Sequence, residues 1–221
     1  MTEPIPAATV VVARDAGDAG DGIEVLMLRR SSRGAFGGMW VFPGGQVDPD
    51  DAAGDELATA RRAAVREAQE EAGLIVDEEA LVPFSHWIPP PQAPKRFSTW
   101  FFLAPAPAVH DVSVDGAEIH DHEWRRPADA VALRDAGEIE LAPPTWVTLW
   151  RLAQAGSVDD AVAQARARPP QRYETHIASA AGVMVALWKG DAGYDDGDLD
   201  KPGPRNRLSM FDDGWRYEDT I

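Results

Sequence analysis

Three glutamates in the run Arg66-Glu67-Ala68-Gln69-Glu70-Glu71-Ala72 have the spacing of a metal-binding helix face. They stand at positions i, i+3 and i+4, which share one side of an α-helix because the helix turns every ~3.6 residues. Three neighbouring carboxylates repel one another, and a hard divalent cation relieves that repulsion by binding their oxygens. The pattern predicts a Mg²⁺ or Mn²⁺ site, and the upstream segment Phe42-Pro43-Gly44-Gly45 predicts a glycine turn beside it.

The helix that carries these glutamates is predicted over residues 55–72. Asp55 is a suitable N-cap, and Gly73 is a suitable C-terminal stop. The apolar positions form one narrow stripe at helical spacing, and the stripe is made mostly of alanine: Leu57, Ala60, Ala64 and Ala68. Such a stripe suits close packing on a sheet, which would leave the acidic side of the helix open.

Short runs rich in β-branched and aromatic residues predict the strands, and proline starts or helical spacing predict three further helices. The predicted strands are Ala8–Ala13, Ile23–Leu28, Met39–Phe42, Phe84–Ile88, Phe97–Ala104, Glu118–Arg126, Gly182–Trp188 and Leu208–Phe211. The predicted helices are Pro127–Ala136, Pro144–Ala155 and Val158–Ala167. A Gly/Asp-rich loop joins the first two strands as a hairpin. The elements alternate without a regular βαβ rhythm, which favours a mixed sheet flanked by helices in the α+β class.

The charge of the chain limits its partners. The formal net charge is −16, and residues 46–80, with eleven acidic and three basic side chains, carry half of it. This surplus disfavours nucleic acid as a partner, because phosphate backbones are bound through positive charge. There are no cysteines, which excludes disulfides and thiolate metal sites. No signal peptide or membrane-spanning run is visible, so we expect a soluble, cytoplasmic protein without a membrane partner.

The chain resembles the Nudix hydrolases. The resemblance rests on Gly45 and on the run that extends from Arg66 through Gly73-Leu74. This run matches the family pattern Arg-Glu-U-x-Glu-Glu-x-Gly-U, where U is a bulky aliphatic residue, except that Ala68 is small for its place. Two other features depart from the family. About seven extra residues separate the glycine from the arginine, in the loop 46–54, and the family's upstream glutamate falls on Ala58. Glu56, half a turn away, is the expected replacement.

The resemblance implies a Nudix fold, which is a mixed β-sheet sandwiched between helices (α/β/α), here with a C-terminal helical extension. It also implies that water attacks a phosphorus of a diphosphate linked to another group. By position, Glu67, Glu70 and Glu71 match the family's metal ligands, with the carbonyl of Gly45 as a possible further ligand. Arg66 matches the arginine that orients these glutamates.

A further carboxylate is expected from the segment 116–124, as a general base or metal ligand. Glu118 is the first choice and Glu123 the second. His120 and His122 are alternative bases, because in an alternating strand they share one face with Glu118.

The segment 25–45 resembles the signature that precedes the motif in coenzyme A diphosphatases. This narrower resemblance implies coenzyme A or acyl-coenzyme A as substrate, and a cluster of basic residues beside the motif would bind a phosphate outside the metal shell. The predicted substrate-binding residues are Arg29, Arg30, Arg33, Arg96 and Gly44.

Other interpretations of the sequence stay open. The substrate could be ADP-ribose, a dinucleotide or another nucleoside diphosphate, and the chain could be a non-catalytic Nudix-like ligand-binding module. The expected partner is a small nucleoside diphosphate-type molecule, and the oligomeric state stays open, a dimer included. We expect a Nudix core over residues 5–142, with residues 143–221 as a helical and strand extension packed on the same domain.

Overall fold

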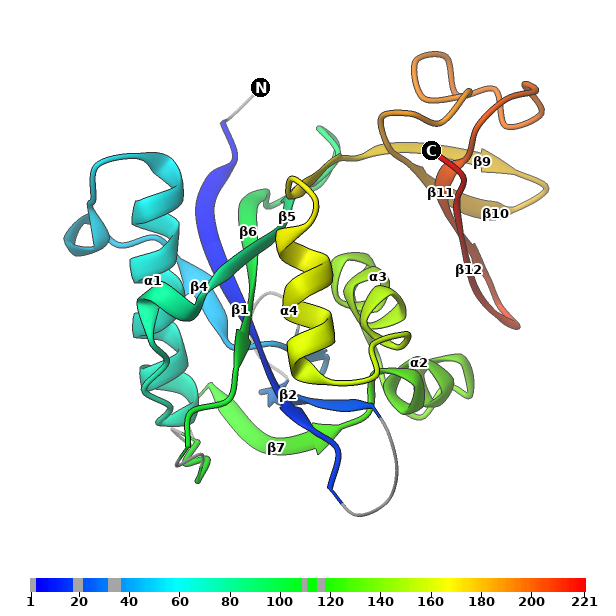
Figure 1. Cartoon of the computed structure of the whole chain (residues 1–221). Helices are drawn as coiled ribbons and strands as arrows, with labels where there is room; N and C mark the ends of the chain where they lie inside the picture. The colour runs from blue at the N-terminus through cyan, green and yellow to red at the C-terminus, as the bar shows by residue number, and fades with distance from the viewer. Residues whose placement is uncertain (1–2, 18–21, 32–36, 109–110, 115–117) are drawn as a thin grey trace.

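A mixed β-sheet runs through the middle of the molecule in the computed structural model, which describes residues 3–17, 22–31, 37–108, 111–114 and 118–221 (Figure 1). Its strands among the described residues are β1 (Ile5–Asp15), β2 (Ile23–Arg30), β3 (Trp40–Val41), β4 (Gly44–Gln46), β5 (Val82–Ile88), β6 (Phe97–Pro105), β7 (Ile119–Arg125) and β8 (Gln171–Glu174). The strand order is β3-β2-β1-β6-β5-β8, with β4 also paired to β1 and β7 also paired to β2.

Strand β1 organises this sheet. It lies parallel to β6 from Ile5 opposite Phe97 to Ala13 opposite Pro105. On its other edge, β2 pairs with its last residues and β4 pairs antiparallel with residues 7–9. The two glycines that were predicted as a turn therefore form a short strand. Glycine is needed there because the two backbones approach closely: a Cβ on Gly44 would stand 2.8 Å from Cα of Thr9 on β1.

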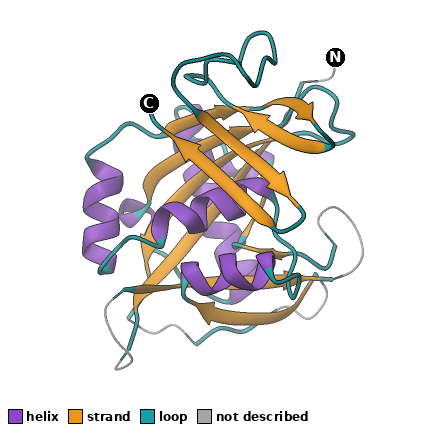
Figure 2. Cartoon of the chain, turned by 90° about the vertical axis from the view of Figure 1, so that its right-hand side faces the viewer, coloured by secondary structure: helices purple, strands orange, loops and turns teal. Residues whose placement is uncertain are grey.

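Helices cover both faces of the sheet, as Figures 1 and 2 show. The helices are α1 (Glu56–Ala72), α2 (Pro127–Asp135), α3 (Pro143–Leu152) and α4 (Val158–Arg166), and the short 3-10 helices are η1 (Pro49–Asp51) and η2 (Glu78–Ala80). The first helix packs on one face through buried alanines, and the other three cover the opposite face. This arrangement confirms the predicted α/β/α sandwich.

The local signals for α1 are confirmed. Asp55 is the N-cap and accepts a hydrogen bond of 2.8 Å from the backbone N–H of Ala58. Gly73 ends the helix with a φ of 69°, a left-handed conformation that suits glycine. No helix in the described part of the chain is long and apolar enough to cross a membrane.

A second, antiparallel sheet follows the helices. It consists of β9 (His176–Ala180), β10 (Val183–Leu187), β11 (Asn206–Phe211) and β12 (Gly214–Asp219) in the order β12-β11-β10-β9. The sequence patterns indicated β10 and β11 but missed β8, β9 and β12. In the main sheet, β8 pairs parallel with β5, so the C-terminal segment also completes one edge of the core.

A buried ion pair anchors the long loop between β10 and β11. Asp191 accepts hydrogen bonds of 2.7 and 2.6 Å from Nε and Nη2 of Arg207, and the two side chains are 0% and 7% exposed. The backbone N–H groups of Gly193 and Asn206 also donate to the same carboxylate. Burial alone would raise the pKa of Asp191, but these hydrogen bonds outweigh it and lower the pKa below its ordinary value.

Replacing Asp191 by asparagine should destabilise the fold by roughly 3–5 kcal/mol near neutral pH, because it leaves the buried Arg207 without its counter-charge. A carboxyl whose pKa is depressed in the folded state stabilises the protein above its unfolded pKa of about 3.9. That contribution disappears as the pH falls through the folded-state pKa, so the deficit of the variant should shrink in acid. Urea unfolding at neutral and acidic pH measures both effects.

The matched control for this prediction is Asp213→Asn. Asp213 pairs with Arg216 on the surface, where the side chains are 72% and 60% exposed, and such pairs contribute at most about 1 kcal/mol. Equal losses in the two variants, or a deficit of Asp191→Asn that does not change with pH, would contradict the role given to the buried pair.

Candidate functional site

The C-terminal half of α1 lies against β4, and two of the predicted metal ligands meet the glycines there. Glu71 is only 5% exposed, and its Oε2 accepts a hydrogen bond of 2.9 Å from the N–H of Gly44. The carboxylate of Glu67 lies against Gly45 so closely that a Cβ on this glycine would overlap it. Glu70 is 58% exposed and pairs with Arg66. Helical spacing thus brings Glu67 and Glu71 to one place.

Arg66 contacts two of the three glutamates, Glu67 and Glu70. Its Nη1 donates to Oε1 of Glu67 at 2.8 Å and to Oε2 of Glu70 at 2.9 Å. Its Nη2 also donates to the carbonyl oxygen of Gln46, at the end of β4, at 2.9 Å. The arginine therefore ties two glutamates of the helix to the glycine strand, which is the arrangement an orienting residue needs.

Asp51 is a residue of this site that the sequence patterns missed. It lies in η1, inside the inserted loop, is 5% exposed, and accepts two hydrogen bonds from Arg66. The expected replacement for the missing family glutamate was Glu56, and that expectation is wrong. Glu56 instead accepts a hydrogen bond of 2.9 Å from Nε1 of Trp100. The one available signal for Asp51 was the acidic composition of the insertion.

These contacts keep the Asp51–Arg66 pair charged. Burial alone would raise the pKa of Asp51, but hydrogen bonds from Arg66 and from the backbone of Asp48 lower it below its ordinary value. The hydrogen bonds to Asp51 raise the pKa of Arg66, so the guanidinium keeps its proton. Burial raises the pKa of Glu67, although Arg66 opposes this effect.

A second arginine contacts two further carboxylates of this acidic site. Arg30, at the end of β2, forms ion pairs with Glu71, at 3.5 Å, and with Glu118. Glu118, the first choice for a further carboxylate, is therefore linked through Arg30 to Glu71 of α1. Arg30 was expected to bind substrate, whereas its described contacts are with the carboxylates of the site.

The second choice, Glu123, lies elsewhere. It lies opposite Met27 where β7 runs beside β2. Its carboxylate forms an ion pair with Arg125, on the face of the sheet opposite α1. The expected alternation of Glu118, His120 and His122 also fails. The pairing of β7 with β2 shifts so that Asp121 faces Arg29 and Ile119 faces Arg30, which leaves His120 as an extra residue in the strand.

The predicted substrate-binding arginines do not form one cluster in the described residues. Arg29 and Arg30 are neighbours in β2, so their side chains point to opposite faces of the sheet. Arg96 donates to the carbonyl oxygen of Pro89 at 3.3 Å, just before β6. Arg33 lies outside the described residues. Gly44, also expected at the substrate, uses its N–H to hold Glu71.

The chemistry of the donors fits a hard divalent cation. Five carboxylates meet two guanidiniums here, which leaves a surplus of three negative charges: Asp51, Glu67, Glu70, Glu71 and Glu118 against Arg30 and Arg66. All the donors are oxygen atoms, which Mg²⁺ and Mn²⁺ prefer. Each of these carboxylates, however, is paired with one of the two arginines. In the described part of the chain, no three acidic or histidine side chains lie in an arrangement that could hold a metal ion.

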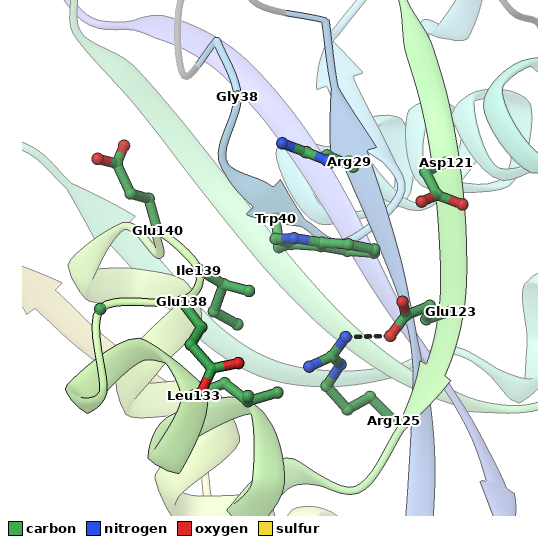
Figure 3. A pocket seen from close by; sticks show the side chains of 11 residues that line it. Arg29, Gly38, Trp40, Asp121, Glu123, Arg125, Leu133, Glu138, Ile139 and Glu140 are labelled. Atoms are coloured by element: carbon green, nitrogen blue, oxygen red, sulfur yellow. Dashed lines mark hydrogen bonds and ion pairs between the residues drawn. The ribbon is translucent and has the colours of Figure 1, made fainter.

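A pocket of about 610 Å³ lies on the other face of the sheet, between β2, β7 and the segment that follows α2 (Figure 3). Arg29 and Trp40 project into it, and Arg125 lies over the Trp40 ring at 5.3 Å. Its lining is rich in carboxylates: Asp121, Glu123, Glu138 and Glu140. Gly38 borders the pocket and donates to the carbonyl oxygen of Arg30. The end of β2 therefore adjoins both the pocket and the acidic site.

Comparison with known proteins gives a consistent family match. A family model described as the NUDIX domain matches residues 3–145. A Caenorhabditis elegans protein with the provisional name nudix hydrolase 7 is 29% identical over an alignment of 172 positions, which covers 61% of this chain and 57% of the relative. The match thus spans little more than half of that relative's length.

Solved structures share the fold. A NUDIX hydrolase from Alicyclobacillus acidocaldarius is 25% identical, with a TM-score of 0.68, over 74% of this chain and 97% of the other. The NUDIX domain of Shewanella oneidensis NrtR, solved with ADP ribose, is 16% identical, with a TM-score of 0.51, over 76% of this chain and 91% of the other. At that identity the second likeness concerns the fold alone.

Proposed function

Because the chain belongs to the NUDIX domain family, we propose that it is a metal-dependent hydrolase of a diphosphate linked to a further group. The observation that carries the proposal is the placement of Glu67 and Glu71 against the Gly44–Gly45 strand, with Arg66 and Arg30 holding their carboxylates. This is an acidic, oxygen-rich site on a rigid helix, which suits a cation that must meet phosphate oxygens.

In this proposal Glu67, Glu70 and Glu71 hold Mg²⁺ or Mn²⁺, with the carbonyl of Gly45 as a further ligand. The ion would neutralise phosphate oxygens and lower the pKa of a bound water. Glu118 is the candidate general base, because it is the carboxylate from outside α1 that Arg30 links to Glu71. Arg66 orients Glu67 and Glu70 and does not itself touch the substrate.

We propose coenzyme A or acyl-coenzyme A as the first candidate substrate. The segment 25–45 supports it through its resemblance to the coenzyme A diphosphatase signature. Arg29 supports it through its position, because it lines the pocket and makes no ion pair with another described residue. A guanidinium in that position is available to a substrate phosphate away from the reacting bond.

The charge of the pocket favours a second candidate, ADP-ribose or another nucleoside diphosphate with an uncharged group. Four carboxylates line the pocket against the two arginines Arg29 and Arg125, and Arg125 is already paired with Glu123. Carboxylates accept hydrogen bonds from ribose hydroxyls, whereas they repel a further phosphate. The two candidates thus differ in whether the pocket must receive a phosphate.

Catalytic efficiencies on coenzyme A, 3′-dephospho-coenzyme A and ADP-ribose, with product identification by mass spectrometry, test the proposal. We expect hydrolysis with Mg²⁺ or Mn²⁺ and none in excess EDTA, and coenzyme A should give 3′,5′-ADP and 4′-phosphopantetheine. If Arg29 binds the 3′-phosphate, Arg29→Gln should lower efficiency on coenzyme A by roughly tenfold more than on the dephospho compound, because one charge-assisted contact contributes about 1.5 kcal/mol or more.

Each other outcome has a defined meaning. Equal losses on coenzyme A and its dephospho form would reject the role of Arg29. Cleavage of ADP-ribose but not of coenzyme A would select the second candidate. Undiminished activity after exhaustive chelation would reject the metal dependence of the reaction. Binding of these compounds without cleavage of any diphosphate would reject the hydrolase proposal and favour a ligand-binding module.

A further inference from the structure

The inserted loop is built around one buried carboxylate. Asp51 lies at the end of η1, and its Oδ2 accepts a hydrogen bond of 2.7 Å from the backbone N–H of Asp48. The side chain of Asp48 in turn accepts one from the N–H of Asp50 at 3.1 Å. The Asp48 side chain also accepts from the backbone N–H of Asp51, which completes a capping box. The backbone N–H of Asp48 thus fixes the direction of the Asp51 side chain within the loop, before it meets the helix.

Asp51 meets Arg66 in a two-pronged contact. Nε of Arg66 donates to Oδ1 at 3.1 Å, and Nη2 donates to Oδ2 at 2.9 Å. Such paired bonds fix the plane of a guanidinium as well as its position. The remaining nitrogen, Nη1, is the one that donates to Glu67 and Glu70. One edge of Arg66 is therefore held by the loop while the opposite edge holds two glutamates.

We propose that Asp51 is a positioning residue for the metal-binding glutamates, and that it acts through Arg66. This inference rests on the proposed function, because it takes Glu67 and Glu70 as metal ligands. The inserted loop then supplies from another part of the chain the carboxylate that is missing at Ala58 on α1. No other carboxylate among the described residues receives two hydrogen bonds from this guanidinium.

The physical reason is competition for the glutamates. A guanidinium without Asp51 can turn its two-pronged edge toward Glu67 or Glu70 and neutralise it, which opposes binding of a cation by the same oxygens. With Asp51 in place, each glutamate receives a single bond from Nη1. Each carboxylate therefore keeps an oxygen that Arg66 does not contact.

The test is the affinity for Mn²⁺ in the absence of substrate, measured by calorimetry and by electron paramagnetic resonance on the full-length chain. Asp51→Asn keeps the size of the side chain but removes its charge, so it should weaken Mn²⁺ binding by roughly 10- to 100-fold, the range for residues that orient metal ligands. Turnover at limiting metal should fall with it and recover in part at high Mg²⁺. Asp51→Glu, which keeps the charge, should retain more affinity than Asp51→Asn.

Two controls separate this role from a general effect of the loop. Asp50→Asn changes the same charge in the same turn, but Asp50 is exposed and its side chain makes no described contact with Arg66. Asp48→Ala removes the side-chain cap of the turn but keeps the backbone N–H that donates to Asp51, and with it the Asp51–Arg66 pair. Both should bind Mn²⁺ nearly as wild type does, and equal losses in either variant and in Asp51→Asn would overturn the proposal.

A double-mutant cycle tests the path through Arg66. If Asp51 acts only by holding Arg66, adding Asp51→Ala to Arg66→Ala should weaken Mn²⁺ binding no further, whereas independent roles would give additive losses. Wild-type affinity in a folded Asp51→Asn variant, additive losses, or no Mn²⁺ binding by the wild type would each overturn the inference. A wild type that binds Mn²⁺ but cleaves no diphosphate would reject the proposed function alone, because the affinity measurements would still decide the role of Asp51.

Discussion

Replacing Glu71 by glutamine should remove nearly all turnover while the fold survives. The carboxylate is buried between the N–H of Gly44 and the guanidinium of Arg30, and glutamine can keep the first contact through its carbonyl oxygen. What it loses is the charge that a divalent cation needs. A bound metal contributes several kcal/mol to the transition state, so a fall in kcat of about 10³-fold is expected.

Glu70→Gln should show a loss of similar size, although Glu70 is far more exposed. Steady-state kinetics at saturating Mg²⁺ measure both variants, and circular dichroism checks the fold. Glu79→Gln is the control, because Glu79 is an exposed glutamate of η2 beyond the end of α1. Near-normal turnover by purified Glu70→Gln or Glu71→Gln would remove that residue from the proposed metal centre.

Gly45→Ala should reduce catalytic efficiency by about 10²-fold, which is the typical effect of a displacement of about 1 Å at a reacting site. A Cβ at this position would overlap the carboxylate of Glu67. The strand cannot move away easily, because Gly45 is paired with Ala8 on β1. The carboxylate must therefore shift, and with it one of the expected metal ligands.

The control for this variant is Gly54→Ala. A Cβ on Gly54 would meet no atom within 4 Å, and neither glycine has a positive φ, so backbone strain does not distinguish the two positions. Gly54→Ala should keep full activity and gain a little stability, since alanine restricts the unfolded chain. Full activity in Gly45→Ala would show that the reaction does not need the Glu67 carboxylate where the structure places it.

The parts of the molecule that the sequence predicted well are those with local signals. The first helix has a cap at Asp55, a stop at Gly73 and an alanine stripe between them, and each signal depends on residues within the helix or next to it. The alternation of side chains along a strand could also have predicted that the adjacent residues Arg29 and Arg30 point to opposite faces. The prediction of an arginine cluster did not take this alternation into account.

Other features depend on partners that are distant in the sequence. Gly44 and Gly45 form a strand only because β1 lies beside them, and their own composition indicates a turn. Asp51 is one of several acidic residues in a polar loop, and nothing local distinguishes it until Arg66 is close. The missed strand β12 had a usable signal, since Trp215 and Tyr217 alternate with Arg216 and Glu218. Strands β8 and β9 contain few apolar β-branched residues.

The parallel pairing of β1 with β6 also sets the order in which this protein can fold. It joins Ile5 to Phe97, about 90 positions later in the chain, and contacts between such distant segments slow folding. During synthesis α1 is complete before β6 exists, and most of the stability of a helix in a protein comes from packing of its apolar face. The sheet on which α1 packs lacks the strand beside β1 until the chain has grown past β6. We therefore expect the glutamates of the nascent N-terminal half to be held less firmly, and to bind metal weakly, until then.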